Sequence, residues 1–91
     1  MTTSQRRHET VFPGFREMAE RRQELVSELE ARRLDLGLTQ TEVAARMGTS
    51  QSAVARLESG DADVRLSTLE RYAAALSHEL EWHLKPKKED S

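Results

Sequence analysis

The 91-residue sequence contains no cysteine, and only 4% of its residues are aromatic. The absence of cysteine excludes disulfides and thiolate metal sites, and it fits a reducing compartment. No apolar run approaches the ~18 residues of a membrane-spanning helix, and the first ten residues lack the apolar centre of a secretion signal. Only 36% of the residues are hydrophobic, so one small core is expected. We therefore expect a cytoplasmic, single-domain protein without membrane contact, which oligomerisation would stabilise.

The sequence also lacks the excess of basic residues that is typical of non-specific nucleic-acid binders. Fourteen Lys and Arg residues stand against sixteen Asp and Glu residues, for a formal net charge of -2. The charge is unevenly distributed: residues 16–31 hold three arginines and five glutamates, whereas residues 32–60 hold four arginines against three acidic residues. The middle of the chain is therefore its least acidic part, a weak indication of where an anionic partner would bind.

One long helix is predicted near the N-terminus. Its apolar stripe consists of Phe15, Met18, Leu25, Leu29 and Leu36. Gly37 follows as a natural stop. A helix over 15–36 would be ~33 Å long, about three times the length of the helices that it packs against. Its N-terminal half, with Phe15, Met18 and the preceding Phe12, should therefore extend beyond the domain and offer an apolar surface to a partner.

Three shorter helices are marked by residues that cap helix N-termini. Thr39 with Glu42 and Ser67 with Glu70 match the capping-box pattern, in which two side chains satisfy unpaired N–H groups of the first turn. Between them, Ser50 is a suitable N-cap for a helix that ends at the next glycine. The sequence therefore predicts three short helices within about forty residues.

The hydrophobic period changes from helical to alternating after Ser77. In residues 79–84, one face would carry Leu80, Trp82 and Leu84, and the other Glu79, Glu81 and His83. This pattern predicts a short strand, but the sequence contains no second strand to pair with it. The strand should therefore pair with a second copy of the chain or with another protein. The expected dimer or partner interface comprises Leu80, Trp82, Leu84, Phe12, Phe15 and Met18.

The first two short helices, joined by "MGTS", form a helix-turn-helix candidate. Its inward-facing positions would be Val43, Ala44 and Met47 in the first helix and Val54 and Leu57 in the second. Gly48 suits a turn position with positive φ. The remaining polar positions of the second helix are Gln51, Ser52 and Arg56, which a helix in the major groove would present to bases. Glutamine can bond adenine bidentately, and arginine can bond guanine.

The stretch "LTQTEVAARMGTSQSAVARLESG" resembles the helix-turn-helix of the Xre, or λ-repressor-like, DNA-binding family. The resemblance covers residues 26–76 and implies an all-α, λ-repressor-like bundle of four to five helices, with the long N-terminal helix and the short C-terminal β-strand added. It implies base reading by Gln51, Ser52 and Arg56, and a structural ion pair between Arg33 and Glu58. The phosphate contacts that it implies are Gln40, Thr49, Ser50 and Arg65. Expected boundaries are a flexible arm over 1–14, the DNA-binding domain over 15–78, and a strand and polar tail over 79–91.

The longer stretch "LESGDADVRLSTLERYAAALSHELEWHL" is similar to HigA-type antitoxins. That similarity implies a homodimer that binds a palindromic double-stranded DNA operator, represses its own operon and neutralises a ribonuclease toxin. Two alternatives stay open: a free-standing or phage-type regulator without a toxin, and a protein-interaction module that has lost DNA binding. We expect no enzyme, because the sequence shows neither a nucleophile–base arrangement nor a phosphate loop. We also expect no cofactor and no metal, since the three histidines are far apart and lack ligand spacing.

Overall fold

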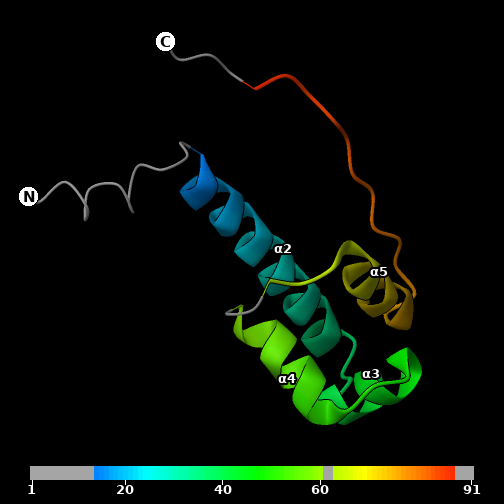
Figure 1. Ribbon diagram of the computed structural model, residues 1–91. Coiled ribbons are helices and arrows are strands. Elements are labelled where there is room, and N and C mark those ends of the chain that lie inside the picture. The colour runs from blue at the N-terminus through cyan, green and yellow to red at the C-terminus, as the bar shows by residue number, and fades with distance from the viewer. Residues whose placement is uncertain (1–13, 61–62, 88–91) are drawn as a thin grey trace, which may run out of the picture.

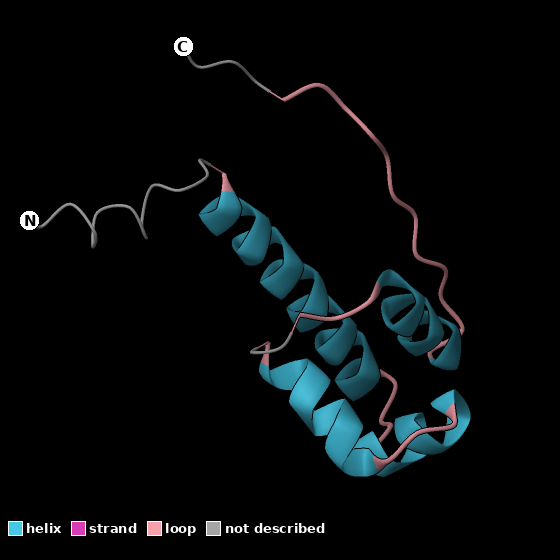
Figure 2. Cartoon of the chain, viewed as in Figure 1, coloured by secondary structure: helices cyan, strands magenta, loops and turns pink. Residues whose placement is uncertain are grey.

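The computed structural model describes residues 14–60 and 63–87, and four helices follow one another through this part of the chain (Figure 1). They are α2 over Phe15–Asp35, α3 over Gln40–Met47, α4 over Gln51–Ser59 and α5 over Leu66–Ala75. Figure 2 shows helices and loops and no strand within the described ranges. The described part of the protein is therefore all-helical.

Helix α2 extends well beyond the rest of the bundle. Its 21 residues make a rod of ~32 Å, and its buried residues, Val26, Leu29 and Arg33, all lie in the C-terminal half. Phe15 and Met18 near its start are 51% and 44% exposed, so the predicted overhang is confirmed for these two residues. Phe12 and most of the predicted arm (residues 1–13) lie outside the described residues.

The predicted end of the α2 stripe is wrong, because Leu36 does not join the core. Leu36 is 51% exposed, because the helix ends at Asp35 and Leu36 is its C-cap residue. The chain then turns at Gly37, and the N–H of Leu38 bonds to the carbonyl of Arg33 at 3.1 Å. The apolar side chain that returns to the core here is Leu38, which is half-buried against it.

Helices α3 and α4 begin at the predicted caps. The Thr39 side chain accepts a hydrogen bond from the Glu42 N–H at 3.0 Å, and the Glu42 carboxylate accepts one from the Thr39 N–H at 2.8 Å. These bonds from Thr39 lower the pKa of Glu42 below its ordinary value. Ser50 caps α4 by accepting from the Ala53 N–H. Between the helices, Gly48 has a φ of 76°, a left-handed conformation that strains other residues.

Helix α5 begins earlier than its capping pattern predicts. The Ser67–Glu70 capping box does not form: the N-cap is Arg65, which makes no side-chain cap, and the helix starts at Leu66. The Arg65 carbonyl accepts from the N–H groups of Thr68 and Leu69, which places Ser67 inside the first turn. At the other end of α5, the N–H of His78 bonds to the carbonyl of Ala73 at 2.8 Å.

The core lies between the C-terminal half of α2 and the three shorter helices: α3 packs against α4 and α5, and α4 and α5 pack against α2. The predicted inward-facing residues of the two short helices are all buried, and Val43 and Val54 are completely inaccessible. The buried hydrophobic residues are Val26, Leu29, Val43, Ala44, Met47, Val54, Leu57, Leu69, Tyr72, Ala73, Ala75 and Leu76. Twelve residues make a small core, and α4 is held in it by one face only.

Residues 79–87 leave the end of α5 as an extended segment that runs back toward the N-terminal end of α2 (Figure 1). The predicted strand does not form in the single chain, because no neighbouring backbone pairs with this segment among the described residues. The end of the segment reaches α2: the Lys87 Nζ atom lies 3.1 Å from where a Cβ on Gly14 would be. Within the described ranges, no helix combines the length and the apolar character needed to cross a membrane.

Candidate nucleic-acid interface

Helix α4 has one buried face and one exposed polar face. Val54 and Leu57 are buried, whereas Gln51, Ser52 and Arg56 are exposed. The two faces follow from the helical period, because a residue three positions after Val54 returns to the core. The exposed face offers two side chains that can bond base edges in pairs, Gln51 and Arg56.

The four predicted phosphate-contacting residues lie in different settings. Thr49 and Ser50 are exposed in the turn before α4, and Arg65 is exposed at the start of α5. Ser50 already caps α4, and its Oγ lies 3.3 Å from the Oγ of Ser52. Gln40, at the first position of α3, is half-buried and makes two hydrogen bonds to other side chains.

A carboxylate in the interior, that of Glu58, joins three elements to α4. Arg33 of α2 donates to it twice, from Nε at 2.8 Å and from Nη2 at 3.0 Å. Gln40 of α3 donates to Oε1 at 2.8 Å, and the Tyr72 hydroxyl of α5 donates to Oε2, so each oxygen accepts from Arg33 and from one further donor. The side chains of Arg33 and Glu58 are only 8% and 4% exposed. A bidentate pair with two further donors is the arrangement in which a buried charge is fully compensated.

The network determines the charge state of its members. Burial alone would raise the pKa of Glu58, but the hydrogen bonds from Arg33, Tyr72 and Gln40 together lower it below its ordinary value. The hydrogen bond to Glu58 raises the pKa of Arg33. Burial, followed by the neighbouring negative charge of Glu58, raises the pKa of Tyr72. Glu58 is therefore an ionised hydrogen-bond acceptor, and Tyr72 is a neutral donor.

The ionised carboxylate fixes the orientation of two amides in series. A carboxylate only accepts hydrogen bonds, so Gln40 must turn its Nε2 toward Glu58 and its Oε1 away. That Oε1 accepts from the Nε2 of Gln51 at 2.6 Å. Gln51 is left with its Oε1 and one N–H, an acceptor and a donor side by side. This pair is complementary to the N6 donor and N7 acceptor of adenine in the major groove.

Two residues of this arrangement were not predicted in their observed role. Gln40 was assigned to a phosphate, but it bridges Glu58 and Gln51. Tyr72 was not singled out, although it is completely buried and its hydroxyl bonds to Glu58. The only signal in the sequence was a tyrosine at a core position of α5, since a buried hydroxyl needs a polar partner.

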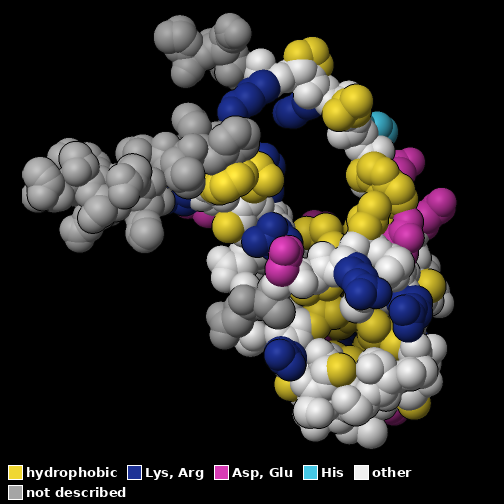
Figure 3. All heavy atoms as spheres, viewed as in Figure 1, with side chains coloured by type: hydrophobic (Ala, Val, Ile, Leu, Met, Phe, Trp, Pro, Cys, Tyr) yellow, Lys and Arg dark blue, Asp and Glu magenta, His cyan; other side chains and the backbone are white. Residues whose placement is uncertain are grey.

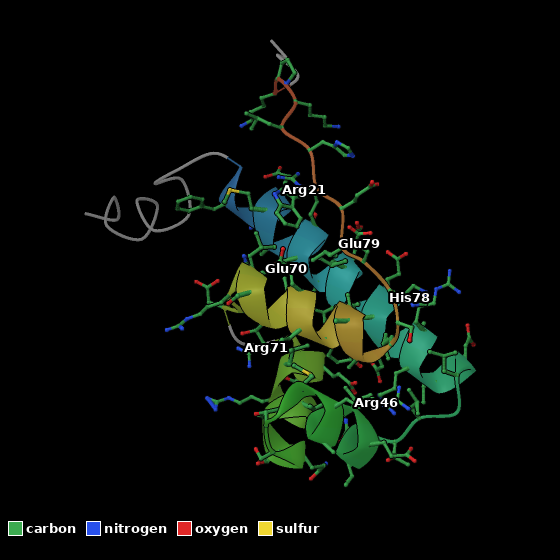
Figure 4. All side chains as sticks on the ribbon, turned by 90° about the vertical axis from the view of Figure 1, so that its right-hand side faces the viewer. Arg21, Arg46, Glu70, Arg71, His78 and Glu79 are labelled. Carbon is green, nitrogen blue, oxygen red and sulfur yellow. The ribbon has the colours of Figure 1, made fainter. Side chains whose placement is uncertain are left out.

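A second contact ties α3 to the end of α5. Arg46 donates from Nη1 to the carbonyl of Ala75 at 2.8 Å. Figure 4 shows Arg46 beside the C-terminal end of α5, far from Arg21 in the overhanging half of α2. A cation at a helix C-terminus satisfies a carbonyl that has no partner within the helix.

The residues predicted for a dimer or partner interface lie away from α4. Trp82 is 57% exposed and Leu84 completely exposed, whereas Leu80 is half-buried against the core. Figure 3 shows hydrophobic side chains on both sides of a hollow, along the C-terminal segment and at the N-terminal end of α2. The helical part of these apolar sides includes Phe15 and Met18.

Comparison with known proteins identifies the family. The model of a family described as helix-turn-helix matches residues 29–82, more than half of the chain. The chain belongs to the Xre-type helix-turn-helix family. The matched region of this Xre-type protein contains α3, α4 and α5 and the whole Glu58 network.

Two curated relatives resemble this helix-turn-helix protein. Each is named antitoxin HigA1, one from Mycobacterium tuberculosis strain CDC 1551 / Oshkosh and one from strain ATCC 25618 / H37Rv. Each is 46% identical over 69 residues, which cover 76% of this chain and 46% of the relative. The chain thus spans less than half the length of these relatives. No solved structure matches the chain.

The potential metal ligands of this family member do not cluster in the part of the chain that the structure describes. Within residues 14–60 and 63–87, histidine, aspartate and glutamate do not gather in any group of three or more that could hold a metal ion. The Nδ1 atom of His78 is hydrogen-bonded to the Leu76 carbonyl oxygen at 2.8 Å. His8 lies outside the described residues.

Proposed function

We propose that this protein is a sequence-specific transcriptional repressor that reads DNA through α4. The observation that carries the proposal is the pre-oriented amide of Gln51, which is held through Gln40 by the buried carboxylate of Glu58. A side chain that is already oriented loses less entropy on binding than a free one. A buried charge network that ends on an exposed amide would have little value for a helix that only packs.

Base and phosphate contacts divide between α4 and its surroundings. Gln51, Ser52 and Arg56 read bases. The phosphate contacts come from Thr49, Ser50, Arg65 and the second N–H of Gln40, whose other amide groups bond to Glu58 and Gln51. Two copies set their α4 helices about one DNA turn apart, ~34 Å, on a palindromic operator. With a net charge of -2, the protein relies on base contacts more than on phosphate neutralisation, so the salt dependence of binding should be modest.

The decisive experiment selects operator sequences from a random duplex library and then measures their affinity for variants. Arg56→Ala should weaken operator binding by about 1–3 kcal/mol and relax the preference at one base pair in each half-site. Arg21→Ala is the matched control: it removes the same charge from an exposed position of α2, outside α4. The control should retain the affinity and the sequence preference of the wild type.

Two outcomes would contradict base reading. If Arg56→Ala and Arg21→Ala both retain full operator affinity, Arg56 does not read a base. If the random library yields no preferred sequence, the protein-interaction module without DNA binding becomes the better interpretation. A circular-dichroism spectrum unchanged from the wild type would show that Arg56→Ala is still folded.

A second function, as an antitoxin, is favoured by the relatives named antitoxin HigA1 and by the exposed apolar end of α2. In this proposal, the chain neutralises a ribonuclease toxin and represses the operon that encodes both proteins. The test begins with the neighbouring reading frame, which should encode a small ribonuclease. Co-expression should rescue growth from that ribonuclease, and Met18→Asp should abolish the rescue. Growth arrest despite co-expression of the wild type would favour a free-standing regulator.

A further inference from the structure

The extended segment over residues 79–87 has an unpaired backbone and a two-faced side-chain pattern. Among the described residues, none of its backbone groups takes part in a backbone hydrogen bond. The even-numbered positions, Leu80 to Pro86, form an apolar face, and Leu80 lies against the core. An apolar face with free backbone donors is a template for strand pairing.

The odd-numbered face has its charges in a particular order. It carries Glu79 and Glu81 before His83, and Lys85 and Lys87 after it. The negative charges thus lie at one end of the segment and the positive charges at the other. Parallel pairing with an identical segment would place like charges together, whereas antiparallel pairing would place each glutamate opposite a lysine.

The register follows from the same order. With His83 opposite His83, Glu79 faces Lys87 and Glu81 faces Lys85, which gives four ion pairs between two copies. The apolar face then pairs Trp82 with Leu84. Sliding one strand by two residues leaves only two glutamate–lysine pairs, and sliding it by one places an apolar face beside a polar one.

Pro86 fits this register and restricts it further. In an antiparallel pair, alternate residues direct their N–H and C=O groups toward the partner strand. If the His83 pair is hydrogen-bonded, the odd positions bond to the partner and the even positions do not. Pro86, which has no N–H, then lies at a position where none is needed.

We propose that residues 79–87 pair antiparallel with the same segment of a second copy, centred on His83. This inference deepens the homodimer of the proposed function and names its interface. Because an isolated two-stranded ribbon is marginally stable in water, its apolar face needs a cover. Met18 and Phe15 are exposed at the overhanging end of α2, where Figure 3 shows hydrophobic side chains across a hollow from the C-terminal segment, and they provide this cover. The ribbon thereby accounts for the exposed Trp82 and Leu84 of the single chain.

A charge-swap series tests the register without DNA. Glu81→Lys and Lys85→Glu each place like charges opposite one another twice per dimer, so each should weaken dimerisation about tenfold or more at low salt. The double variant E81K/K85E should restore the wild-type dissociation constant. The matched control E81K/K87E has the same net charge but leaves every altered position opposite a like charge, so it should stay weak. Sedimentation equilibrium measures the dimer dissociation constants of all four variants.

Cysteine cross-linking gives an independent test, because the natural chain has no cysteine. His83→Cys should form an intermolecular disulfide rapidly under mild oxidation, since opposite Cα atoms of a hydrogen-bonded pair are about 5.5 Å apart. Glu79→Cys should not, because the two introduced thiols would be separated by about 26 Å along the ribbon.

Equal cross-linking of the two cysteine variants, or no rescue in E81K/K85E, would overturn the inference. Selection of operators by the wild type is measured separately, so that result would leave base reading by α4 intact. Conversely, a dimer that follows the charge-swap pattern but selects no DNA sequence would refute the proposed function alone.

Discussion

The two ends of α2 lie in opposite kinds of environment. Around its C-terminal half, Val26 and Leu29 are buried in the core, and Arg33 is neutralised by Glu58 within hydrogen-bond distance. Around its N-terminal half, Phe15 and Met18 remain exposed, and the C-terminal segment passes with Trp82 and Leu84 uncovered. The first region satisfies its own apolar and polar groups, whereas the second leaves large apolar side chains exposed. The same helix thus contributes to the core at one end and, in the proposed dimer, to the interface at the other.

The largest effect should come from removing the carboxylate at the centre of the buried charge network, that of Glu58. Glu58→Ala leaves Arg33 as a buried charge without its partner and removes the acceptor of Gln40 and Tyr72. We expect a loss of about 3–5 kcal/mol in the free energy of unfolding, measured by urea denaturation. Glu28→Ala, on the exposed side of α2, is the control and should change that free energy by less than about 0.5 kcal/mol. Similar values for the two variants would show that the network does not stabilise the fold.

The comparison between the regions is sharpest when the same substitution is made in both. Leu57→Ala removes a buried side chain and should cost about 3 kcal/mol in the free energy of unfolding. Leu84→Ala removes a fully exposed side chain and should cost less than about 0.5 kcal/mol in dilute, monomeric protein. At concentrations that favour dimers, the same Leu84→Ala change should lower the melting temperature, because it weakens the interface. An equally large cost in the monomer would mean that residues 79–87 belong to the core.

Acid should reduce the stability that the Glu58 network contributes to the fold. Because the folded-state pKa of Glu58 is lower than its ordinary value of 4.5, the network contributes its stability above that value and loses it as the pH falls through the lower, folded-state pKa. The free energy of unfolding should therefore decrease as the pH falls below about 4.5. Glu58→Gln cannot take up a proton there, so its decrease should be shallower, although it is less stable at neutral pH. Parallel curves for the two proteins would exclude Glu58 as the titrating group.

Local patterns in the sequence predicted the helix-turn-helix well. Thr39 and Ser50 cap their helices, and Val54 and Leu57 are buried, because these features depend on neighbours within one or two helical turns. Ser67 has an equally suitable pattern, yet α5 begins before it at Leu66, with the chain entering from Arg65. A capping residue thus predicts a helix start only when the preceding chain enters at the right position.

Long-range contacts could not be predicted in the same way. Gln40 lies 18 residues before Glu58 and 11 before Gln51, and nothing local indicates that it bridges them. The hydroxyl of Tyr72 finds its partner on another helix. The alternation over residues 79–84 indicates a strand, but a strand needs a partner, and the single chain supplies none among its described residues. What was missed is therefore what depends on tertiary or intermolecular neighbours.

The orientation of Gln40 has a consequence for how such a protein could acquire a new operator. The amide of Gln51 presents its acceptor and donor in an order that is dictated from inside the protein, through position 40. Replacing residue 51 alone would leave the Oε1 of Gln40 without its donor, so the new side chain would start without support. In the proposed operator complex, retargeting the base pair at Gln51, in evolution or by design, is therefore a two-residue change, whereas Arg56 can be exchanged by itself.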